Sequence, residues 1–312
     1  MKNFLNIPSR YVSLLFAFSN CLVGCSLGFY YGQITLSTLF IAFCMLVAGV
    51  GVQSLCNYSI SYSRAYQKHK SDKKLGIVWP IMIGQISLNS LKKRMAILTV
   101  MTAFFGGLAI YLSMGNNIQI LSWFIFLCAV GILMTSFFTI NTENIYENIS
   151  AHIIFFIFSV AAIASCQIIV VCASTDTLDF YPDTLFLGVN SGIASLMFLY
   201  VKNIGMNVHS PFLFKYKLSK VIKYELSTVY LIALMVAYCL TSVVACVTSH
   251  KAIEAILIIL GYIPMFYLVY VIIKLKNRTN QLRLRLGQLM FNCCINNFIW
   301  IGILIIDYSL YS

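Results

Sequence analysis

The sequence predicts an all-α membrane protein that crosses the bilayer nine times. Three observations lead to this fold class: 60% of the 312 residues are hydrophobic, 10% are charged, and the apolar residues gather into long runs. A run of about 20 apolar residues is what an α-helix needs to cross the hydrocarbon layer. A soluble domain of this length carries far more charge, so the composition excludes an ordinary cytosolic protein.

Nine apolar runs are long enough to be spans, with boundaries uncertain by several residues. The first is predicted to be a retained helix and not a signal peptide, because no small-residue cleavage site follows it. The nine runs cover residues 12–30, 34–56, 95–114, 119–139, 151–172, 184–201, 227–248, 252–273 and 289–310.

The basic residues give the orientation. With nine spans and a cytoplasmic N-terminus, 20 of the 21 lysines and arginines fall on the cytoplasmic side, and Lys251 falls on the other side. This asymmetry is the positive-inside rule, and it places the C-terminus outside. The opposite face is acidic between the fifth and sixth spans, where Asp176, Asp179 and Asp183 lie. Topology and attraction to anionic lipid therefore explain the net charge of +12, and no nucleic-acid partner is needed.

The cysteines do not form a metal-binding or redox pattern. The chain has 11 of them, mostly inside apolar runs, with no C-x-x-C pair and no Cys/His spacing typical of zinc. We expect them to be small buried hydrophobic residues, and we predict no metal site from them.

Two cytoplasmic connections carry the candidate binding residues. In the first, Asn57, Ser61 and Arg64 recur at the spacing of one helix face, and Lys68 follows. A polar stripe at the cytoplasmic end of a span suits a polar headgroup that sits above an apolar chamber. An ordinary interfacial helix end, with polar side chains reaching water, explains the same pattern.

The second connection begins with Lys202 and Asn203, which directly follow the sixth span.

Within the spans, Asn20 and Gln53 are polar residues that are costly in hydrocarbon, so we expect them to face the bundle interior and line a cavity. Hydrogen bonding between helices is the alternative role for such residues.

Five short segments stand out in chain order. They are Ser9-Arg10, Tyr30-Tyr31-Gly32, Gln53-Ser-Leu-Cys-Asn57-Tyr, Trp79-Pro80-Ile-Met-Ile-Gly84-Gln-Ile86-Ser87 and Tyr200-Val-Lys202-Asn203. Together they resemble the UbiA superfamily of intramembrane prenyltransferases, most of all its dihydroxynaphthoate polyprenyltransferase branch, which acts in menaquinone biosynthesis.

The resemblance implies a single transmembrane domain, residues 1–312, with nine helices around a central cavity in a bacterial cell membrane. The loops at about 57–94 and 202–226 would form a cytoplasmic cap over that cavity. It also implies transfer of a polyprenyl group from its diphosphate to an aromatic quinone precursor, with Mg²⁺ as the cofactor.

Both aspartate-rich motifs of that family are degenerate here. The two aspartates of the first motif fall on Ser61 and Arg64, and those of the second fall on Met206 and Ser210. Mg²⁺ requires oxygen ligands that usually include carboxylates, so the family's metal site is not expected in this chain. The arginines of two further motif positions are also replaced, by Trp79 and Gly205.

The sequence therefore leaves open whether the protein is an enzyme. One possibility is a divergent prenyltransferase in which Arg64, Lys68 and Lys202 bind the diphosphate directly, since both cations bind phosphate well. Another is a relative without catalytic activity that binds an isoprenoid or quinone-like lipid, or serves as an accessory membrane protein. A transporter of a lipid-linked anion is disfavoured, because the sequence shows no internal repeat and no charge in mid-span other than Asp307, which lies near the end of the last span.

Overall fold

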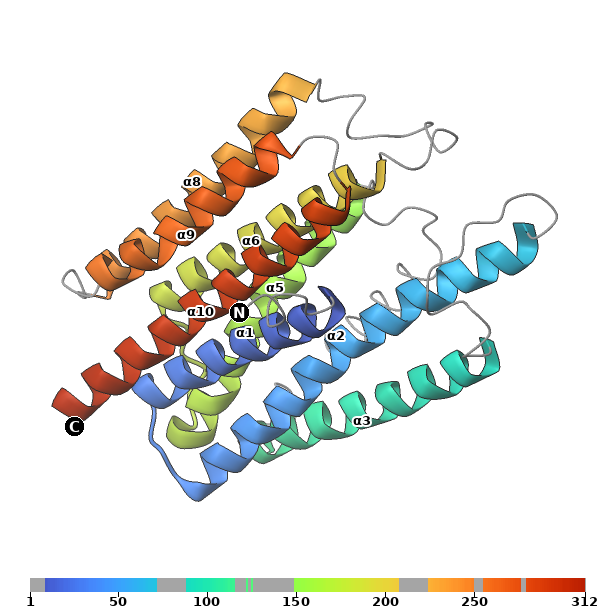
Figure 1. The fold of residues 1–312 in the computed structure, drawn as a ribbon. Coiled ribbons are helices and arrows are strands. Elements are labelled where there is room, and N and C mark those ends of the chain that lie inside the picture. Colours follow the sequence, from blue (N-terminus) through green and yellow to red (C-terminus); the bar gives the residue numbers. More distant parts are fainter. Residues whose placement is uncertain are drawn as a thin grey trace, which may run out of the picture. The chain divides into compact units, whose positions relative to one another are not determined.

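The structure is a computed structural model in which residues 9–71, 88–115, 149–207, 224–249, 255–275 and 279–311, with Ser122 and Ile125, are described. These residues are almost entirely helical (Figure 1). The long helices are α1 (Ser9–Tyr31), α2 (Leu36–Ser71), α3 (Leu88–Met114), α5 (Ile149–Thr175), α6 (Pro182–Asn207), α8 (Tyr224–Thr248), α9 (Ala255–Lys274) and α10 (Thr279–Tyr311).

All of these helices are long and apolar enough to cross a bilayer, as judged by length and composition. The chain is an integral membrane protein with an all-α fold, as the sequence predicts. The part of the chain that the structure describes holds eight such helices, not the nine predicted. The predicted span at 119–139 lies outside the described residues, apart from Ser122 and Ile125.

Two helices extend well beyond the apolar runs that predicted them. Helix α2 continues to Ser71 instead of ending near residue 56, and α10 begins at Thr279 instead of near residue 289. Hydropathy detects the stretch that lies in hydrocarbon, whereas a helix satisfies its own backbone and continues into water until its sequence breaks it. Most of the predicted first cap loop is therefore helix, and residues 72–87 of it lie outside the described residues.

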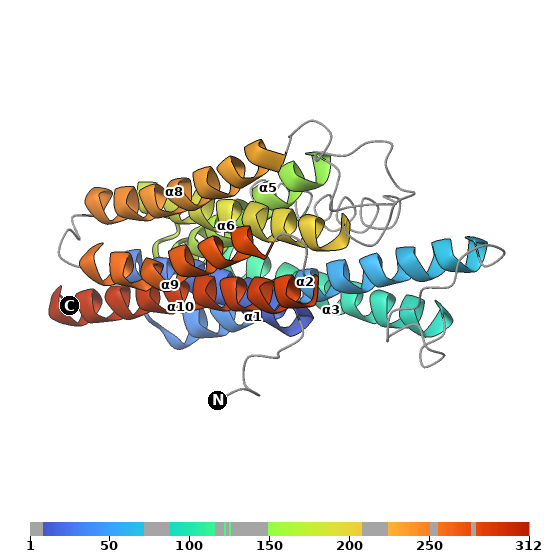
Figure 2. The same cartoon turned by 45° about the horizontal axis from the view of Figure 1, so that its top comes forward.

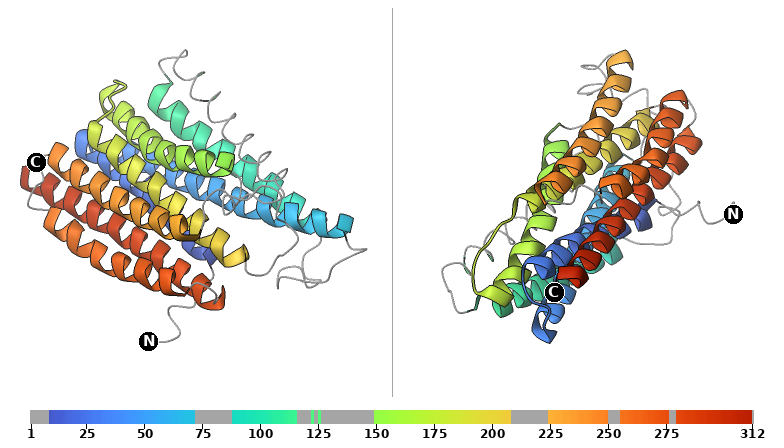
Figure 3. Two further views of the ribbon diagram at one scale, coloured as in Figure 1. Left: turned by 90° about the horizontal axis from the view of Figure 1, so that it is seen from above. Right: turned by 90° about the vertical axis from the view of Figure 1, so that its left-hand side faces the viewer.

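The chain divides into two compact units. The first unit comprises Met1–Ala42 with Tyr146–Ser312, and the second comprises Phe43–Ile145. In the first unit each helix packs on the next in the order α1, α5, α6, α8, α9, α10, and α10 packs back on α1. The ring of six helices is closed, and α6 also contacts α10 across it (Figures 2 and 3).

Glycines bring α1 and α5 into backbone contact. A Cβ atom placed on Gly24 would lie 2.4 Å from the carbonyl oxygen of Ile163 and 2.7 Å from the Cβ of Cys166. Similarly, a Cβ on Gly192 of α6 would lie 2.6 Å from the ring of Phe156 in α5. Small residues at helix contacts are typical of membrane bundles, because close packing replaces the hydrophobic driving force that lipid does not provide.

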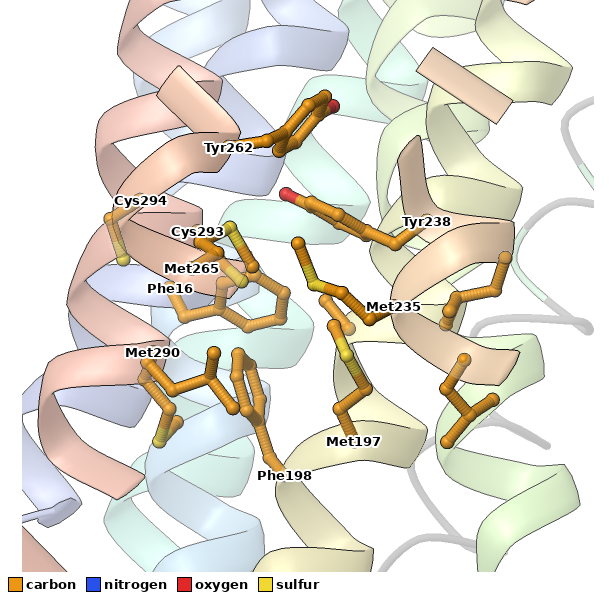
Figure 4. Close-up of a cluster of buried hydrophobic side chains, with 14 of the residues drawn as sticks. Phe16, Met197, Phe198, Met235, Tyr238, Tyr262, Met265, Met290, Cys293 and Cys294 are labelled. Atoms are coloured by element: carbon orange, nitrogen blue, oxygen red, sulfur yellow. The ribbon is translucent and has the colours of Figure 1, made fainter. Parts of the chain in front are cut away.

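Sulfur-containing and aromatic side chains fill the centre of the first unit (Figure 4). Methionine is flexible and cysteine is small, so both can fill irregular gaps between helices. The rings of Tyr238 and Tyr262 meet edge to face at 5.3 Å, and the Tyr262 hydroxyl is hydrogen bonded to Ser242. The residues labelled in the figure are Phe16, Met197, Phe198, Met235, Tyr238, Tyr262, Met265, Met290, Cys293 and Cys294.

A buried carboxylate joins three helices of the first unit at one end. Asp183, at the start of α6, is 3% exposed and its Oδ2 accepts hydrogen bonds from the Tyr31 hydroxyl of α1 (2.5 Å) and from Ser249 after α8 (3.3 Å). Its Oδ1 accepts the backbone N–H of Thr184 at 2.9 Å. Hydrogen bonds to an ionised group are roughly twice as strong as neutral ones, so this carboxylate fixes the ends of α1, α6 and α8 together.

Aromatic contacts surround this carboxylate. The ring of Tyr181 stacks on that of Tyr31 with centroids 3.6 Å apart. Burial raises the pKa of the Tyr181 hydroxyl, and so do the negative charges of Asp179 and Asp183. The Tyr30 hydroxyl donates to Asp307 of α10 at 2.7 Å. Tyr30 and Tyr31 thus hold α1 to α6 and to α10 at this end.

The second unit contains an antiparallel pair made by α2 and α3. Phe43 packs edge to face on Phe105 near one end, and Gly51 lies against Thr102 in the middle, where a Cβ on the glycine would be 2.3 Å from the threonine hydroxyl. Arg94 reaches the Tyr58 hydroxyl near the other end. These contacts run in opposite directions along the two helices, so the pair is antiparallel.

Substitution at Gly24 tests the contact between α1 and α5. We expect Gly24→Val to lower the free energy of unfolding by about 2 kcal/mol, because the new side chain overlaps backbone and Cβ atoms that cannot move independently. The measurement is thermal unfolding of detergent-purified protein followed by circular dichroism. Gly302→Ala is the matched control, since nothing lies within 4 Å of a Cβ at that position. Equal stability of the two variants would contradict the close approach.

Substitution at Asp183 tests the three-helix junction. We expect Asp183→Asn to lower the free energy of unfolding by about 2 kcal/mol, because the neutral amide weakens two hydroxyl contacts and turns one oxygen into a donor. Asp176→Asn, at an exposed residue with φ 56°, is the control, and asparagine tolerates that backbone conformation. A melting temperature for Asp183→Asn that matches Asp176→Asn would mean that the carboxylate contributes little.

Candidate functional site

Five candidate residues share one face of α2. Because α2 is helical from Leu36 to Ser71, Gln53, Asn57, Ser61, Arg64 and Lys68 fall within an arc of roughly 80° around its axis. The structure therefore places these five positions on one helix face, and their role as headgroup ligands stays a prediction. Ser61 is buried, and Gln53 and Asn57 are half-buried. Arg64 and Lys68 lie beyond the residues whose side chains are described.

The hydroxyl of Ser61 already has a partner within its own helix. Its Oγ donates to the carbonyl oxygen of Asn57 at 2.7 Å. This is the usual way in which serine satisfies itself inside an apolar helix, and it leaves the oxygen lone pairs of Ser61 as acceptors. The hydroxyl hydrogen of Ser61 is therefore used within its own helix. Ser61 has no charge and no remaining hydrogen with which to bind a phosphate.

Lys202 and Asn203 lie in the last turns of α6, which belongs to the first unit. Their positions on the helix are described, whereas their side chains are not. The candidate residues of α2 beyond Ala42 belong to the second unit, so a shared ring of headgroup ligands stays a prediction.

Asn20 forms a polar link between α1 and α10. It is almost fully buried, and its Oδ1 accepts a hydrogen bond from Nδ2 of Asn297 at 2.8 Å. The same Nδ2 also donates to the hydroxyl of Ser19 at 2.9 Å, and Ser19 donates to the carbonyl oxygen of Phe16. Asn20 is thus buried in an interhelical hydrogen bond, and its predicted role in lining a cavity stays a prediction.

The α10 side of this link, Asn297, was not among the residues predicted from the sequence. Asn296 and Asn297 interrupt the apolar run at 289–310, and that interruption was the available signal. Asn296 donates to the sulfur of Met265 at 3.1 Å, and its own buried oxygen faces Gly261 of α9. Adjacent asparagines thus hold α10 to α1 on one side and to α9 on the other.

The start of α3 carries three exposed cations, Lys92, Lys93 and Arg94. Arg94 Nη1 lies 3.5 Å from the Tyr58 hydroxyl, and Lys92 Nζ lies 5.8 Å from the centroid of the Tyr62 ring. Both tyrosines belong to the polar end of α2. These cations were counted in the sequence only as markers of topology, and their pairing with α2 became visible only in the structure.

The residues that the sequence resemblance places at the family's motif positions do not fit a magnesium ion. Ser61 is neutral and Arg64 is a cation, and neither can supply the negative charge that Mg²⁺ requires. Met206 lies in α6, and Ser210 lies outside the described residues. Among the residues that the structure describes, no three His, Cys, Asp or Glu side chains are close enough together to hold a metal.

Two solved structures have the same fold as this chain. One is the apo structure of a UbiA homologue from Aeropyrum pernix K1, with a TM-score of 0.61 and 13% identity over 96% of this chain and 97% of that one. The other is a digeranylgeranylglyceryl phosphate synthase, with a TM-score of 0.56 and 15% identity over 94% of this chain and 97% of that one. No protein-family model and no curated protein sequence matches the chain.

These matches show the fold. The chain has the same helical membrane fold as the UbiA homologue and the digeranylgeranylglyceryl phosphate synthase, over nearly its whole length. Identities of 13% and 15% establish the fold, and they do not transfer a substrate or a catalytic residue.

Substitution at Asn297 tests the polar link between α1 and α10. We expect Asn297→Ala to lower the free energy of unfolding by about 1 kcal/mol, because it leaves Asn20 without its donor in an apolar interior. Asn292→Ala is the control on the same helix, since Asn292 donates to Gln288 of its own helix at 3.1 Å. Thermal unfolding in detergent distinguishes the two, and an equal loss in both variants would argue against a specific link.

Proposed function

We propose that this chain is a divergent UbiA-type protein that binds a polyprenyl diphosphate at the cytoplasmic end of α2 and transfers its prenyl group to an aromatic quinone precursor. The observation that carries the proposal is the polar face of α2, which runs from Gln53 to Lys68 in a chain with a UbiA-type fold. In the sequence resemblance, the same face holds the family's first aspartate-rich motif.

Cations would replace the metal at this site. Arg64, Lys68 and Lys202 would pair with the diphosphate oxygens, and the side-chain amides of Asn57 and Asn203 would donate further hydrogen bonds. A guanidinium binds phosphate oxygens in pairs and keeps its charge at any physiological pH. Arg64 in place of an aspartate thus turns a cation site into an anion site.

The transfer itself requires the bond between the prenyl carbon and the diphosphate oxygen to break. The diphosphate leaves with the electron pair, an aromatic ring carbon attacks the prenyl carbon, and the ring loses a proton. Cations around the leaving group stabilise its developing charge, which is the contribution that the chain's own residues offer. Gln53 and Asn20 are the residues proposed from the sequence to line the chamber for the lipid.

A second candidate function is a relative without catalytic activity that holds an isoprenoid or quinone-like lipid. The replacement of all four motif aspartates, with Ser61 bonded to its own helix, favours this role. Turnover separates the two functions, because a binding protein would retain the diphosphate lipid and release no diphosphate when dihydroxynaphthoate is supplied.

The proposed orientation places the N-terminus in the cytoplasm and the C-terminus outside, in a bacterial cell membrane. The basic residues at the end of the α2–α3 pair and the acidic residues between α5 and α6 support this arrangement, because cytoplasmic ends are rich in lysine and arginine.

Substitution at Arg64 tests the direct contact with diphosphate. We expect Arg64→Ala to weaken binding of a polyprenyl diphosphate by roughly tenfold, because a charge-assisted contact contributes about 1.5 kcal/mol or more. Binding is measured on detergent-purified protein with EDTA and with added Mg²⁺, and wild-type affinity should be the same in both. Arg285→Ala is the control, since Arg285 donates to Gln288 of its own helix at 2.8 Å. Unchanged affinity in Arg64→Ala would refute the cation site.

A further inference from the structure

Among its described residues, the polar end of the second unit has several cations and no carboxylate. Lys92, Lys93 and Arg94 are exposed at the start of α3. Residues 43–71 and 88–115, the described helical parts of this unit, contain no aspartate or glutamate. A cluster of like charges without an opposing charge of its own attracts an anion from the surroundings. We call Tyr58, Tyr62, Lys92, Lys93 and Arg94 the basic end.

Tyrosines of α2 position the cations of the basic end. Arg94 donates to the Tyr58 hydroxyl at 3.5 Å, which is a long contact, and Lys92 lies 5.8 Å from the Tyr62 ring, within the range of a cation–π interaction. Tyr58 and Tyr62 are one helical turn apart on α2, and each contacts one of the two cations. A tyrosine hydroxyl that accepts from arginine keeps its own hydrogen for donation to a phosphate oxygen.

The basic end lies at one end of two candidate spans, as judged by length and composition. The apolar part of α2 ends at Tyr62, and that of α3 begins at Asn89. Tyrosine, lysine and arginine concentrate at this level of membrane proteins, since their rings and stems lie in the interface and their polar ends reach water.

An apolar stripe continues from the cations toward the membrane interior. Ile97, Met101 and Phe104 are exposed, and they follow Arg94 at the spacing of one face of α3. A ligand with a phosphate at one end and acyl chains at the other matches a row that begins with a cation and continues with exposed apolar side chains. Inorganic phosphate would use only the first part of that row.

We propose that the basic end, with the apolar stripe of α3 below it, is a binding site for an anionic phospholipid whose headgroup phosphate lies between Lys92, Arg94 and the Tyr58 hydroxyl. This site is separate from the proposed diphosphate site, which uses the face of α2 that contains Asn57, Ser61 and Arg64. It does not require that the protein be an enzyme.

The test is native mass spectrometry of the detergent-purified full chain, titrated with dioleoyl phosphatidylglycerol or dioleoyl phosphatidylcholine. Wild-type protein should bind phosphatidylglycerol more tightly than phosphatidylcholine. K92Q/R94Q should lose that preference, with affinity for phosphatidylglycerol weaker by roughly tenfold, since each cation near the surface contributes to attraction of anionic lipid. R94Q alone should show a smaller loss, and it replaces the double variant if that does not fold.

The matched control is K274Q, which removes a lysine that lies 4.5 Å from the Tyr270 ring in the first unit. This variant should keep the preference of the wild type. Phosphatidylglycerol binding by a folded K92Q/R94Q or R94Q variant at wild-type affinity would overturn the proposal. Displacement of phosphatidylglycerol by a polyprenyl diphosphate, with loss of that competition in the same variants, would assign the basic end to the isoprenoid and would also overturn it.

Discussion

The arrangement of the first unit depends on the backbone contact between α1 and α5. Gly24 leaves no room for a side chain against Ile163 and Cys166, so α1 lies deep against its neighbour. From that position α1 also packs on α10 and contacts α6, and the ring of six helices closes. In a lipid environment such contacts replace the hydrophobic effect as the source of helix association, because lipid tails are as apolar as the side chains they compete with.

Hydrogen bonds then fix the rotation and height of helices that close packing alone leaves adjustable. Asp183 joins α1, α6 and α8 at one end, and the pairing of Asn20 with Asn297 joins α1 and α10 inside the bundle. An amide or carboxylate buried in hydrocarbon is costly without a partner, so each such group permits few orientations of its helix. These side chains specify which faces of the helices meet.

The charge of the candidate residues, and not the fold, decides which ligand the proposed site suits. The fold supplies apolar helices with polar ends, and the proposed diphosphate site uses one of these ends. The face of α2 that holds Asn57, Ser61 and Arg64 occupies such an end, yet its charge is the reverse of a magnesium site. Cations on α2 and on α3 make this part of the chain suited to anionic lipids, with the diphosphate of an isoprenoid and the phosphate of a phospholipid as the two chemistries proposed.

The sequence by itself determined the fold class, the approximate position of each described span and the polar stripe of α2. Each of these follows from local periodicity, since an apolar run of fixed length and a spacing of three or four residues need no knowledge of neighbours. Only the tertiary structure showed that Asn20 pairs with Asn297, that Asp183 is a buried junction instead of a loop carboxylate, and that Arg94 and Lys92 meet tyrosines of α2. Those contacts join residues far apart in the chain. Packing decides which helix faces meet, at sites such as Gly24 and Gly51, where the absence of a side chain lets the neighbouring helix come close.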